Sequence, residues 1–368
     1  MVAQYQGQPR RVAQYQGQPR RVAQYQGQPR RVAPTKRSQT PTMRAIQLHQ
    51  FGSVKELYLA EFPTPEPQDY EIRVKVKATA LNRADLLQRE GKYPPPPGES
   101  PIMGLEMAGE VEKLGAKVNK WKIGDRVCGL LAGGAYAQYV VIHEDMAMAI
   151  PPNLDFLAAA AIPEAFLTAF QALVWIAKLQ PAETLLIHAG ASGVGTAALQ
   201  LSRLIGATTY VTASAEKHAL CLSLGAERCI DYKSEDFADC IHTWTEGRGV
   251  DVVLDFLGAS YLERNLKALG MDGRMVLLAL MGGAQAPGIN LGLILMKRLS
   301  LHGSTLRART LQYKTALTHD FMELTWAHFA SGNLFPVLDK VFPWEEVAQA
   351  HLYMEGNRNQ GKIVLSVQ

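Results

Sequence analysis

Hydrophobic and polar positions alternate strictly over residues 71–78, where Ile72, Val74, Val76 and Ala78 would share one face of a strand. Similar short apolar segments, separated by glycines, occur at residues 107–114, 126–131 and 135–142. Met43 opens a further alternating segment that we interpret as the first strand. The chain from Met43 to about Ile150 therefore predicts a β-rich domain.

Beyond Leu157 the apolar period changes from two residues to about 3.6, which indicates helix. Strands are then expected at residues 184–188, 208–212, 250–254 and 274–280, with helices at 196–205 and 215–224 between them. Strands that alternate with helices in this way form parallel βαβ units, so the second part of the chain predicts an α/β, doubly wound domain. A last helix at 344–354 precedes a short strand at 361–365, which is expected to rejoin the first domain.

The chain opens with a ten-residue repeat, Val-Ala-Gln-Tyr-Gln-Gly-Gln-Pro-Arg-Arg, which starts at Val2, Val12 and Val22. Each copy contains Gly and Pro and too few apolar residues to build a core, so residues 1–42 are expected to be disordered. Two interpretations remain open: a solvated tail, or an arginine-rich targeting arm.

The positive formal net charge of +4 comes from residues 1–42 alone. Residues 1–42 contain eight of the 38 Lys and Arg residues and no acidic residue, so the rest of the chain has 30 basic and 34 acidic residues. An acidic body disfavours nucleic acid as a partner.

The four cysteines, Cys128, Cys221, Cys229 and Cys240, are scattered and form no Cys-x-x-Cys pair, which favours a reducing compartment. No uncharged apolar run reaches about 18 residues, and no apolar signal segment opens the chain. We therefore expect a cytoplasmic protein with no membrane partner.

A glycine loop, Ala189-Gly190-Ala191-Ser192-Gly193-Val194-Gly195, follows the strand at 184–188 and precedes a helix. Small residues at this position let a dinucleotide pyrophosphate approach the free N–H groups of the helix N-terminus. The other interpretation is a tight strand-to-helix turn with no ligand, but the order of strand, loop, helix and strand favours a cofactor.

The choice of cofactor depends on the end of the second strand, where NAD enzymes usually carry an acidic residue. This chain has Thr212-Ala213-Ser214 there, followed by Lys217, which can bind a 2′-phosphate. NADPH is therefore favoured. Glu216 could instead bind the ribose, and Lys217 could be an ordinary solvated lysine.

Several strings together resemble the medium-chain dehydrogenase/reductase superfamily: residues 80–85 (ALNRAD), 104–109 (GLEMAG), 189–195 and 361–365 (GKIVL). Within it, residues 93–98 (YPPPPG) and 161–165 (AIPEA) resemble the zinc-free, zeta-crystallin-like quinone oxidoreductases, and most of all their tumour-suppressor-inducible branch. The resemblance covers Met43 to Val367. It implies a GroES-like catalytic domain at 43–160 and 302–368, and a Rossmann domain for NADPH at 161–301.

The resemblance also implies a set of site residues. Asn82 and Tyr93 would be catalytic, on the nicotinamide side of the cleft, although Tyr93 could equally be a rigid aromatic wall. The cofactor would be bound by Thr168, by Ser192, Gly193 and Val194 at the pyrophosphate, by Lys217 and Tyr232 at the 2′-phosphate, and by Leu280, Met281 and Asn359. For Tyr232, an ordinary loop aromatic is the alternative.

No metal is expected, because Leu105 and Asn82 stand where zinc-dependent members have a ligating His and Cys. His188, beside the glycine loop, is interpreted as a buried structural residue rather than a catalytic one. Arg307 and Arg309 either contact acidic substrates or remain solvated surface arginines.

By resemblance, the chain is expected to be an NADPH-dependent quinone reductase whose partner is a small-molecule quinone. The alternatives are a 2-alkenal or enone reductase on the same scaffold, or a zeta-crystallin-like RNA-binding or structural protein. A homodimer is expected from the family and from the apolar run Ile289 to Leu295 near a predicted strand edge.

Overall fold

The alternating segment forms strand β3 (Glu71–Ala80) in the computed structural model of the protein, which describes residues 41–367. As predicted, Ile72, Val74 and Val76 are buried. The strand belongs to a seven-stranded sheet in the order β14-β15-β3-β4-β5-β7, with β6 paired to β3. Its other strands are β4 (Glu106–Leu114), β5 (Arg126–Leu130), β6 (Tyr139–His143), β7 (Ala147–Ala149), β14 (Leu338–Pro343) and β15 (Lys362–Ser366).

The C-terminal strand β15 pairs antiparallel with β3, with Val364 opposite Ala80, so the predicted return of the chain to the first sheet is confirmed. The first strand, β1 (Thr42–Leu48), pairs instead with β2 (Leu57–Pro63) in a separate two-stranded sheet. The predicted tail at 1–42 lies outside the described residues except for Pro41 and Thr42.

The second sheet has six strands in the order β10-β9-β8-β11-β12-β13, and every neighbouring pair is parallel. This order, in which the first three strands run outward one way and the next three the other way, is that of a doubly wound Rossmann fold. The predicted α/β fold class is therefore confirmed. The strands are β8 (Thr184–Ile187), β9 (Thr208–Ala213), β10 (Arg228–Asp231), β11 (Val250–Asp255), β12 (Leu269–Leu277) and β13 (Ser300–Gly303).

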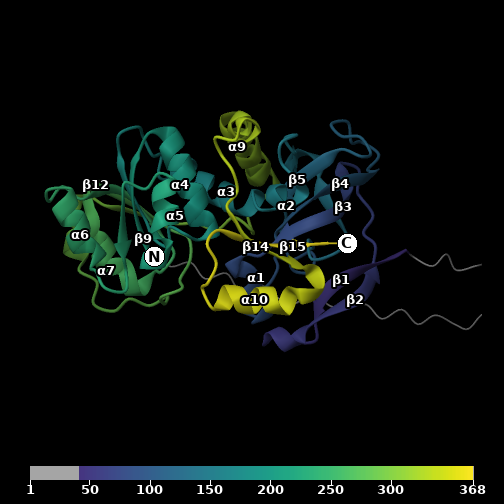
Figure 1. The fold of residues 1–368 in the computed structure, drawn as a ribbon, viewed down its shortest axis with the longest axis horizontal. Coiled ribbons are helices and arrows are strands. Elements are labelled where there is room, and N and C mark those ends of the chain that lie inside the picture. The colour runs from purple at the N-terminus through teal and green to yellow at the C-terminus, as the bar shows by residue number, and fades with distance from the viewer. Residues whose placement is uncertain (1–40, 368) are drawn as a thin grey trace, which may run out of the picture. The chain divides into compact units, whose positions relative to one another are not determined.

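Helices cover both sheets (Figure 1). Around the second sheet lie α4 (Gly193–Ile205), α5 (His218–Ser223), α6 (Phe237–Trp244), α7 (Ala259–Ala268) and α8 (Leu291–Lys297). With the first sheet lie α1 (Arg83–Arg89), α2 (Phe156–Ala160), α9 (Leu311–Ser331) and α10 (Val347–Glu355). Helix α3 (Pro163–Phe170) continues as the π-helical segment η3 (Gln171–Ile176), and short 3-10 turns form η1 (Val54–Glu56), η2 (Glu144–Met146), η4 (Ala215–Lys217) and η5 (Trp344–Glu346).

One predicted strand differs in the structure. The strand expected at 274–280 is β12, which ends at Leu277, so Leu280 lies in the following loop. The apolar run from Ile289 to Leu295, expected near a strand edge, forms most of helix α8, and Asn290 caps this helix by accepting a hydrogen bond from the Gly292 N–H (2.9 Å).

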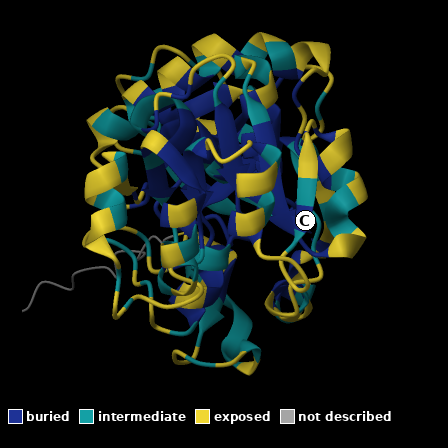
Figure 2. Cartoon of the chain, turned by 90° about the vertical axis from the view of Figure 1, so that its left-hand side faces the viewer, coloured by how far each residue is buried: buried dark blue, intermediate teal, exposed yellow. Residues whose placement is uncertain are grey.

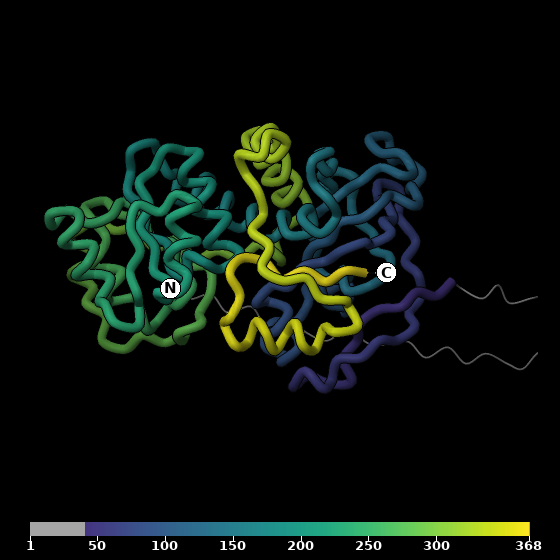
Figure 3. The backbone as a smooth tube through the Cα atoms, in the orientation of Figure 1, coloured from purple at the N-terminus to yellow at the C-terminus, as the bar shows by residue number. Residues whose placement is uncertain are grey.

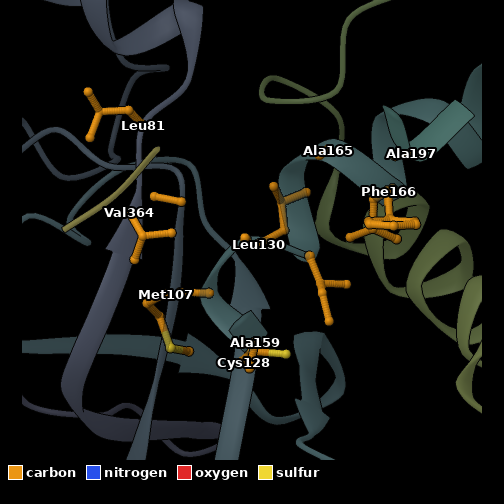
Figure 4. Packing of buried hydrophobic residues seen from close by; sticks show 14 of the residues in the cluster. Leu81, Met107, Cys128, Leu130, Ala159, Ala165, Phe166, Ala197 and Val364 are labelled. Atoms are coloured by element: carbon orange, nitrogen blue, oxygen red, sulfur yellow. The ribbon is translucent and has the colours of Figure 1, made fainter. Parts of the chain in front are cut away.

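One apolar cluster connects the two sheets. Figure 4 shows it running from Met107 and Val364 in the first sheet, through Ala165 and Phe166 on α3, to Ala197 on α4. Figure 2 shows the same division by burial, with the strands inside and the outer helix faces exposed. Burying a side chain such as Phe166 contributes about 1.5–3 kcal/mol, so α3 helps to hold the two sheets together.

The chain passes between the two sheets twice, through α2 and α3 and again through residues 304–310, which join β13 to α9 (Figure 3). The second crossing is fixed by Gln171, which accepts a hydrogen bond from the Ser304 hydroxyl (3.1 Å) and donates one to the Tyr313 hydroxyl (2.9 Å). Among the helices of residues 41–367, none has both the length and the apolarity to cross a bilayer.

Candidate active site

The glycine loop lies between β8 and α4, as predicted. Ser192 is the N-cap of α4, and its hydroxyl accepts a hydrogen bond from the Gly195 N–H (3.0 Å). Ser192 forms a parallel bridge with Gly361, which turns the Gly193 N–H towards β15, while the Val194 N–H has no protein acceptor within the described residues. A free donor at the start of a 13-residue helix fits an oxygen of a pyrophosphate, where the helix dipole also favours negative charge.

The glycines of this loop are required by close backbone contacts. A Cβ at Gly195 would lie 2.4 Å from the Ala189 carbonyl oxygen, and one at Gly193 would lie 2.6 Å from the Lys362 Cδ. The residues therefore form a cradle that a larger side chain would fill, which is the arrangement that a dinucleotide cofactor needs.

Lys362, at the start of β15, joins this loop to the catalytic domain. The Gly361 N–H donates to the Ala191 carbonyl (2.8 Å), so the loop and β15 are directly linked. The Lys362 ammonium is buried, with 4% of the side chain exposed, and bonds to Glu106 Oε1 (2.7 Å), Asn82 Oδ1 (2.6 Å) and the Leu81 carbonyl (3.0 Å). A buried ammonium is stable only with such partners.

Asn82 is positioned by this ion pair. Its Nδ2 donates to Glu106 Oε1 (2.8 Å), while its Oδ1 accepts from Lys362. The backbone N–H groups of Asn82 and Gly104 donate to Asp85 (2.8 and 3.1 Å). Burial raises the pKa of Asp85 to about 6, against the lowering effect of those two hydrogen bonds.

Glu164 contributes a second carboxyl group beside the ion pair. Its backbone N–H donates to Glu106 Oε2 (2.8 Å), and its side chain hydrogen-bonds Thr168 one turn later on α3. Burial raises the pKa of Glu164 to about 7, and the Lys362 charge partly opposes that shift. The site therefore contains a carboxyl group that holds a proton for much of the time at neutral pH.

Tyr93 lies in the turn after α1, and its ring faces the Arg307 guanidinium, 5.2 Å from the ring centroid. Burial raises the pKa of the Tyr93 phenol, and the nearby Glu164 charge acts in the same direction. The structure thus connects Asn82 to Thr168 through Glu106 and Glu164, whereas the contacts of Tyr93 are with Arg307.

The hydroxyl-rich end of β9 differs in detail from the prediction. The Thr212 hydroxyl is buried and bonds to His188 Nδ1 (3.0 Å), so it faces away from the cofactor edge. The Ser214 hydroxyl hydrogen-bonds the exposed Glu216, which also lies 3.6 Å from Lys233. Glu216 is thus held among neighbouring polar groups.

Lys217 lies against the loop that contains Asn359. The Lys217 ammonium donates to the carbonyls of Asn357 (2.7 Å) and Asn359 (2.9 Å), which joins the cofactor domain to the loop before β15. Tyr232 lies in the turn after β10 with 47% of its surface exposed.

Leu280 and Met281 are half exposed and lie in the loop that follows β12, near the carboxyl end of β11. Leu280 lines a pocket of about 150 Å³ together with Asp255, Leu277 and His302. This edge, where parallel strands end, is where cofactors bind in doubly wound sheets.

His188 has a structural role. It is fully buried, Nδ1 faces Thr212 and Nε2 lies 2.7 Å from Asn265 Oδ1, and burial lowers its pKa to about 4. A neutral imidazole with both nitrogens engaged inside the sheet layer fits the structural interpretation.

Three functional candidates were missed in the sequence. Lys362 and Glu106 were used only as parts of the motifs that resemble the family. A charged residue at the start of an apolar strand could have singled each of them out as a candidate site residue. Glu164 gave no such signal, since it follows a proline at a helix start, where acids are common. The prediction that Arg307 is a rim or surface arginine is wrong: its side chain is buried and hydrogen-bonded within the protein.

The donor set of the cleft does not suit zinc. The ammonium of Lys362 occupies the space between Asn82 and Glu106, and Leu105 offers no donor atom. Within residues 41–367, the group of His, Cys, Asp or Glu side chains close enough to share an ion is His319, Asp320 and Glu323, exposed on α9 and outside the cleft.

Two family models match the chain. The alcohol dehydrogenase GroES-like domain matches residues 68–152, and the zinc-binding dehydrogenase family matches residues 224–365. The first match covers β3 to β7 of the first sheet, and the second covers β10 to β13 of the second sheet with the return to the first.

Curated relatives and solved structures cover most of the described chain. The quinone oxidoreductase of Rattus norvegicus is 30% identical over 88% of this chain and 97% of its own length. The phthioceranic/hydroxyphthioceranic acid synthase of Mycobacterium tuberculosis is 32% identical over 88% of this chain, but the chain spans only 15% of that synthase.

Among solved structures, the Escherichia coli quinone oxidoreductase complexed with NADPH has a TM-score of 0.80 at 32% identity, covering 88% of this chain and 99% of that one. The CurK enoyl reductase has a TM-score of 0.80 at 30% identity, covering 89% and 99%. With a doubly wound cofactor sheet, a GroES-like sheet and these relatives, the chain belongs to the quinone oxidoreductase family of the medium-chain dehydrogenase/reductase superfamily.

Proposed function

We propose that the protein is an NADPH-dependent quinone reductase that works without a metal. One observation carries the proposal: Lys362 touches the glycine loop with its stem and binds Asn82 and Glu106 with its ammonium. The pyrophosphate cradle and the predicted nicotinamide side of the cleft are therefore parts of one continuous site.

A bound nicotinamide would supply the hydride, which is chemistry that the protein itself lacks. Ser192, Gly193 and Val194 would bind the pyrophosphate, and Thr168 would lie beside the ring. The protein's remaining tasks are to orient the quinone and to supply the proton that accompanies the hydride. Tyr93 would line the quinone space, and the Glu164 carboxyl group can hold a proton at Oε near neutral pH.

The absence of metal in the proposal rests on the Lys362–Glu106 pair. A zinc ion at the position of the Lys362 ammonium would need three protein ligands, and Asn82, Leu105 and Glu106 do not offer them. Activity should therefore persist after dialysis against EDTA, and loss of activity that added zinc restores would contradict this part of the proposal.

The preference for NADPH rests on Lys217, whose ammonium contacts the Asn359 carbonyl, and on Tyr232 by resemblance. Replacing Lys217 with Met should raise the KM for NADPH about tenfold, because a charge-assisted bond to the 2′-phosphate is lost, and should leave the KM for NADH unchanged. Lys233→Met is the matched control, since among the described residues the Lys233 ammonium pairs with the exposed Glu216. Equal effects on both cofactors would contradict the assignment.

A second function on the same scaffold is reduction of an enone or 2-alkenal. The similarity to the CurK enoyl reductase favours it, because a conjugated carbonyl and a quinone present similar electrophiles to a hydride. The two functions need the same cofactor site and differ in the substrate space beside Tyr93.

The deciding experiment follows NADPH and NADH oxidation by the full chain with ortho-quinones, para-quinones and short enals. A kcat/KM for quinones well above that for enals would support the proposal. Faster turnover of enals would favour the second function. If no substrate oxidises NADPH above the blank, while labelled RNA binds with a steep salt dependence, both enzyme assignments fail.

The proposal includes a homodimer in the cytoplasm with the domain division predicted above. Support for the dimer comes from the edge strand β13, whose residues are all exposed, and from the exposed apolar side chains of Leu291, Leu295 and Met296 on α8 beside it. An unpaired strand edge next to an apolar helix face suits a twofold partner.

A further inference from the structure

Arg307 lies on the second crossing between the two sheets, and only 6% of its surface is exposed. A buried guanidinium costs free energy unless its donors are satisfied. Here the bonded partners are neutral oxygens of the catalytic domain rather than a carboxylate, so the side chain links parts of that domain together.

The guanidinium reaches three separate segments. Nε donates to the Ala132 carbonyl (2.7 Å) in the loop after β5, Nη1 to the Tyr93 carbonyl (3.1 Å), and Nη2 to Gln88 Oε1 (2.7 Å) on α1. The same group lies over the Tyr93 ring. Arginine alone offers several donors in a fixed planar fork, and a lysine could not make all three bonds.

One of these segments leads directly to the candidate site. Helix α1, which carries Gln88, begins after its N-cap Asn82, and Asn82 bonds to Lys362 and Glu106. Arg307 itself is held by the crossing, where Ser304 bonds to Gln171. The position of the Tyr93 ring is therefore set from the crossing rather than by the Tyr93 turn alone.

We propose that Arg307 is a positioning residue that determines substrate selectivity, because it holds Tyr93 and the loop at 131–134 as a fixed wall against which a quinone of matching width is oriented. The inference rests on the proposed function and deepens it. Arg307 acts through Tyr93, since its hydrogen-bond donors are directed at the protein. A wall held in this way should select between quinones by their shape. If the wall becomes mobile, narrow quinones should lose their fixed orientation before wide ones.

The test compares Arg307→Met and Arg307→Lys with Arg309→Met. Arg309 is exposed, donates to the Thr305 carbonyl (3.1 Å) and lies over Tyr313, so it offers a matched loss of charge two residues away. The kcat and KM of each variant are measured for 1,4-benzoquinone and 9,10-phenanthrenequinone, and the Kd for NADPH is measured by fluorescence titration.

In Arg307→Met we expect the KM for the narrow quinone to rise about tenfold and the selectivity between the two quinones to change about fivefold, with the Kd for NADPH within about twofold of wild type. Arg307→Lys should recover only part of the selectivity, and Arg309→Met should match wild type. Tyr93→Ala should reproduce the selectivity change, and the double variant with Arg307→Met should be no worse than the poorer single one. A uniform fall in kcat for both quinones, or an equal loss of NADPH affinity, would show a merely structural role and overturn the inference.

Hydrogen exchange gives a readout that does not depend on activity. Amides in residues 87–98 and 131–135 should exchange faster in Arg307→Met than in the wild-type protein. Their exchange rates in Arg309→Met should equal those of the wild type. If wild-type protein reduces no quinone, the proposed function fails, while unchanged exchange in these two segments would by itself overturn the role of Arg307.

Discussion

Single buried polar residues connect the two halves of the cleft. Lys362 and Glu106 form an ion pair that is almost fully removed from water, and Asn82 bonds to both partners. Removing one member of a buried pair leaves the other charge without compensation, whereas removing both does not. The Lys362–Glu106 pair therefore contributes both to the stability of the protein and to the geometry of the site.

Replacing Lys362 with Met should lower the free energy of unfolding by about 3–5 kcal/mol, because Glu106 remains charged and buried. The double variant Lys362→Met with Glu106→Gln should be less destabilised than the single one, since the amide carries no charge. Urea denaturation measures both. Lys267→Met is the control: it breaks an exposed pair with Glu263 and should cost only about 0.5 kcal/mol. Additive losses in the double variant would contradict the coupling.

For single residues, the sequence predicted the type of site better than the contacts between its residues. Asn82 and the glycines were accessible because their strings are contiguous. The Lys362–Glu106 pair joins residues 256 positions apart, and Arg307 reaches Gln88 across 219 positions. Such contacts join segments that are far apart in the sequence and meet only in the folded chain, and no local pattern carries them.

The two ends of helix α4 have different roles, because substitutions at its N-terminus should affect cofactor binding and those at its C-terminus should affect stability. Its N-terminus carries the glycine cradle, and its C-terminus ends at Gly206, whose φ of 89° lies in the left-handed region. A side chain at Gly206 would be strained but would meet only the Pro181 Cβ at 3.9 Å.

Gly195→Ala should weaken NADPH binding by about tenfold or more, on the order of 1.4 kcal/mol, because its Cβ would push the Ala189 carbonyl out of the loop. Gly206→Ala should reduce stability by about 1 kcal/mol through backbone strain and leave the Kd for NADPH unchanged. Fluorescence titration and thermal unfolding of both variants check the contrast. A similar Kd in the two variants would mean that the loop is only a turn.

The elements that the sequence failed to predict have weak or ambiguous patterns. Helix α9 buries Thr318 and Thr325 alongside Phe321, so its inner face shows little contrast with its outer face. The run at 289–295 is too short for its apolar residues to distinguish strand from helix, and the Asn290 cap decides in favour of helix. By contrast, β3 was predictable because its alternation leaves one face entirely apolar.

Across the whole molecule, buried titratable groups make stability depend on pH in two directions. Burial raises the pKa of Glu164 to about 7 and those of Asp85 and Asp255 to about 6, so the folded chain holds protons that the unfolded chain has already released. Their contribution is complete below the ordinary carboxyl pKa and is lost as the pH rises through 6 to 7. His188 and His351, with pKa values lowered to about 4 and about 3, act oppositely and lose their contribution as the pH falls below 6.5.

Between pH 6 and 8 Glu164 releases its proton in the folded chain, so its contribution to stability should fall over this range. Glu164→Gln should reduce that fall by about 1 kcal/mol, because an amide has no proton to release. Urea denaturation at pH 6, 7 and 8 measures the slope, with Glu263→Gln as an exposed control. A slope in Glu164→Gln equal to that of wild type would contradict the raised pKa.

The exposed apolar side chains of α8 suggest how two copies would meet. Leu295 is 77% exposed on α8, with Leu291 and Met296 similarly exposed, and β13 leaves one edge of the six-stranded sheet unpaired. Isolated edges of this kind are usually blunted by charge or covered. Pairing β13 with its copy across a twofold axis would extend the sheet and bring the α8 faces together, because an isologous contact uses the same patch twice.

Light scattering should therefore give wild-type protein twice the mass of one chain, and Leu295→Lys should shift it towards a single chain by placing a charge in the apolar contact. Leu222→Lys, on the half-exposed face of α5, is the matched control and should remain dimeric. The glycine loop follows β8, in the middle of the sheet and away from β13. The monomeric variant should therefore bind NADPH with wild-type affinity. A monomeric wild type, or a Leu295→Lys variant that stays dimeric, would show that another surface or no surface joins the copies.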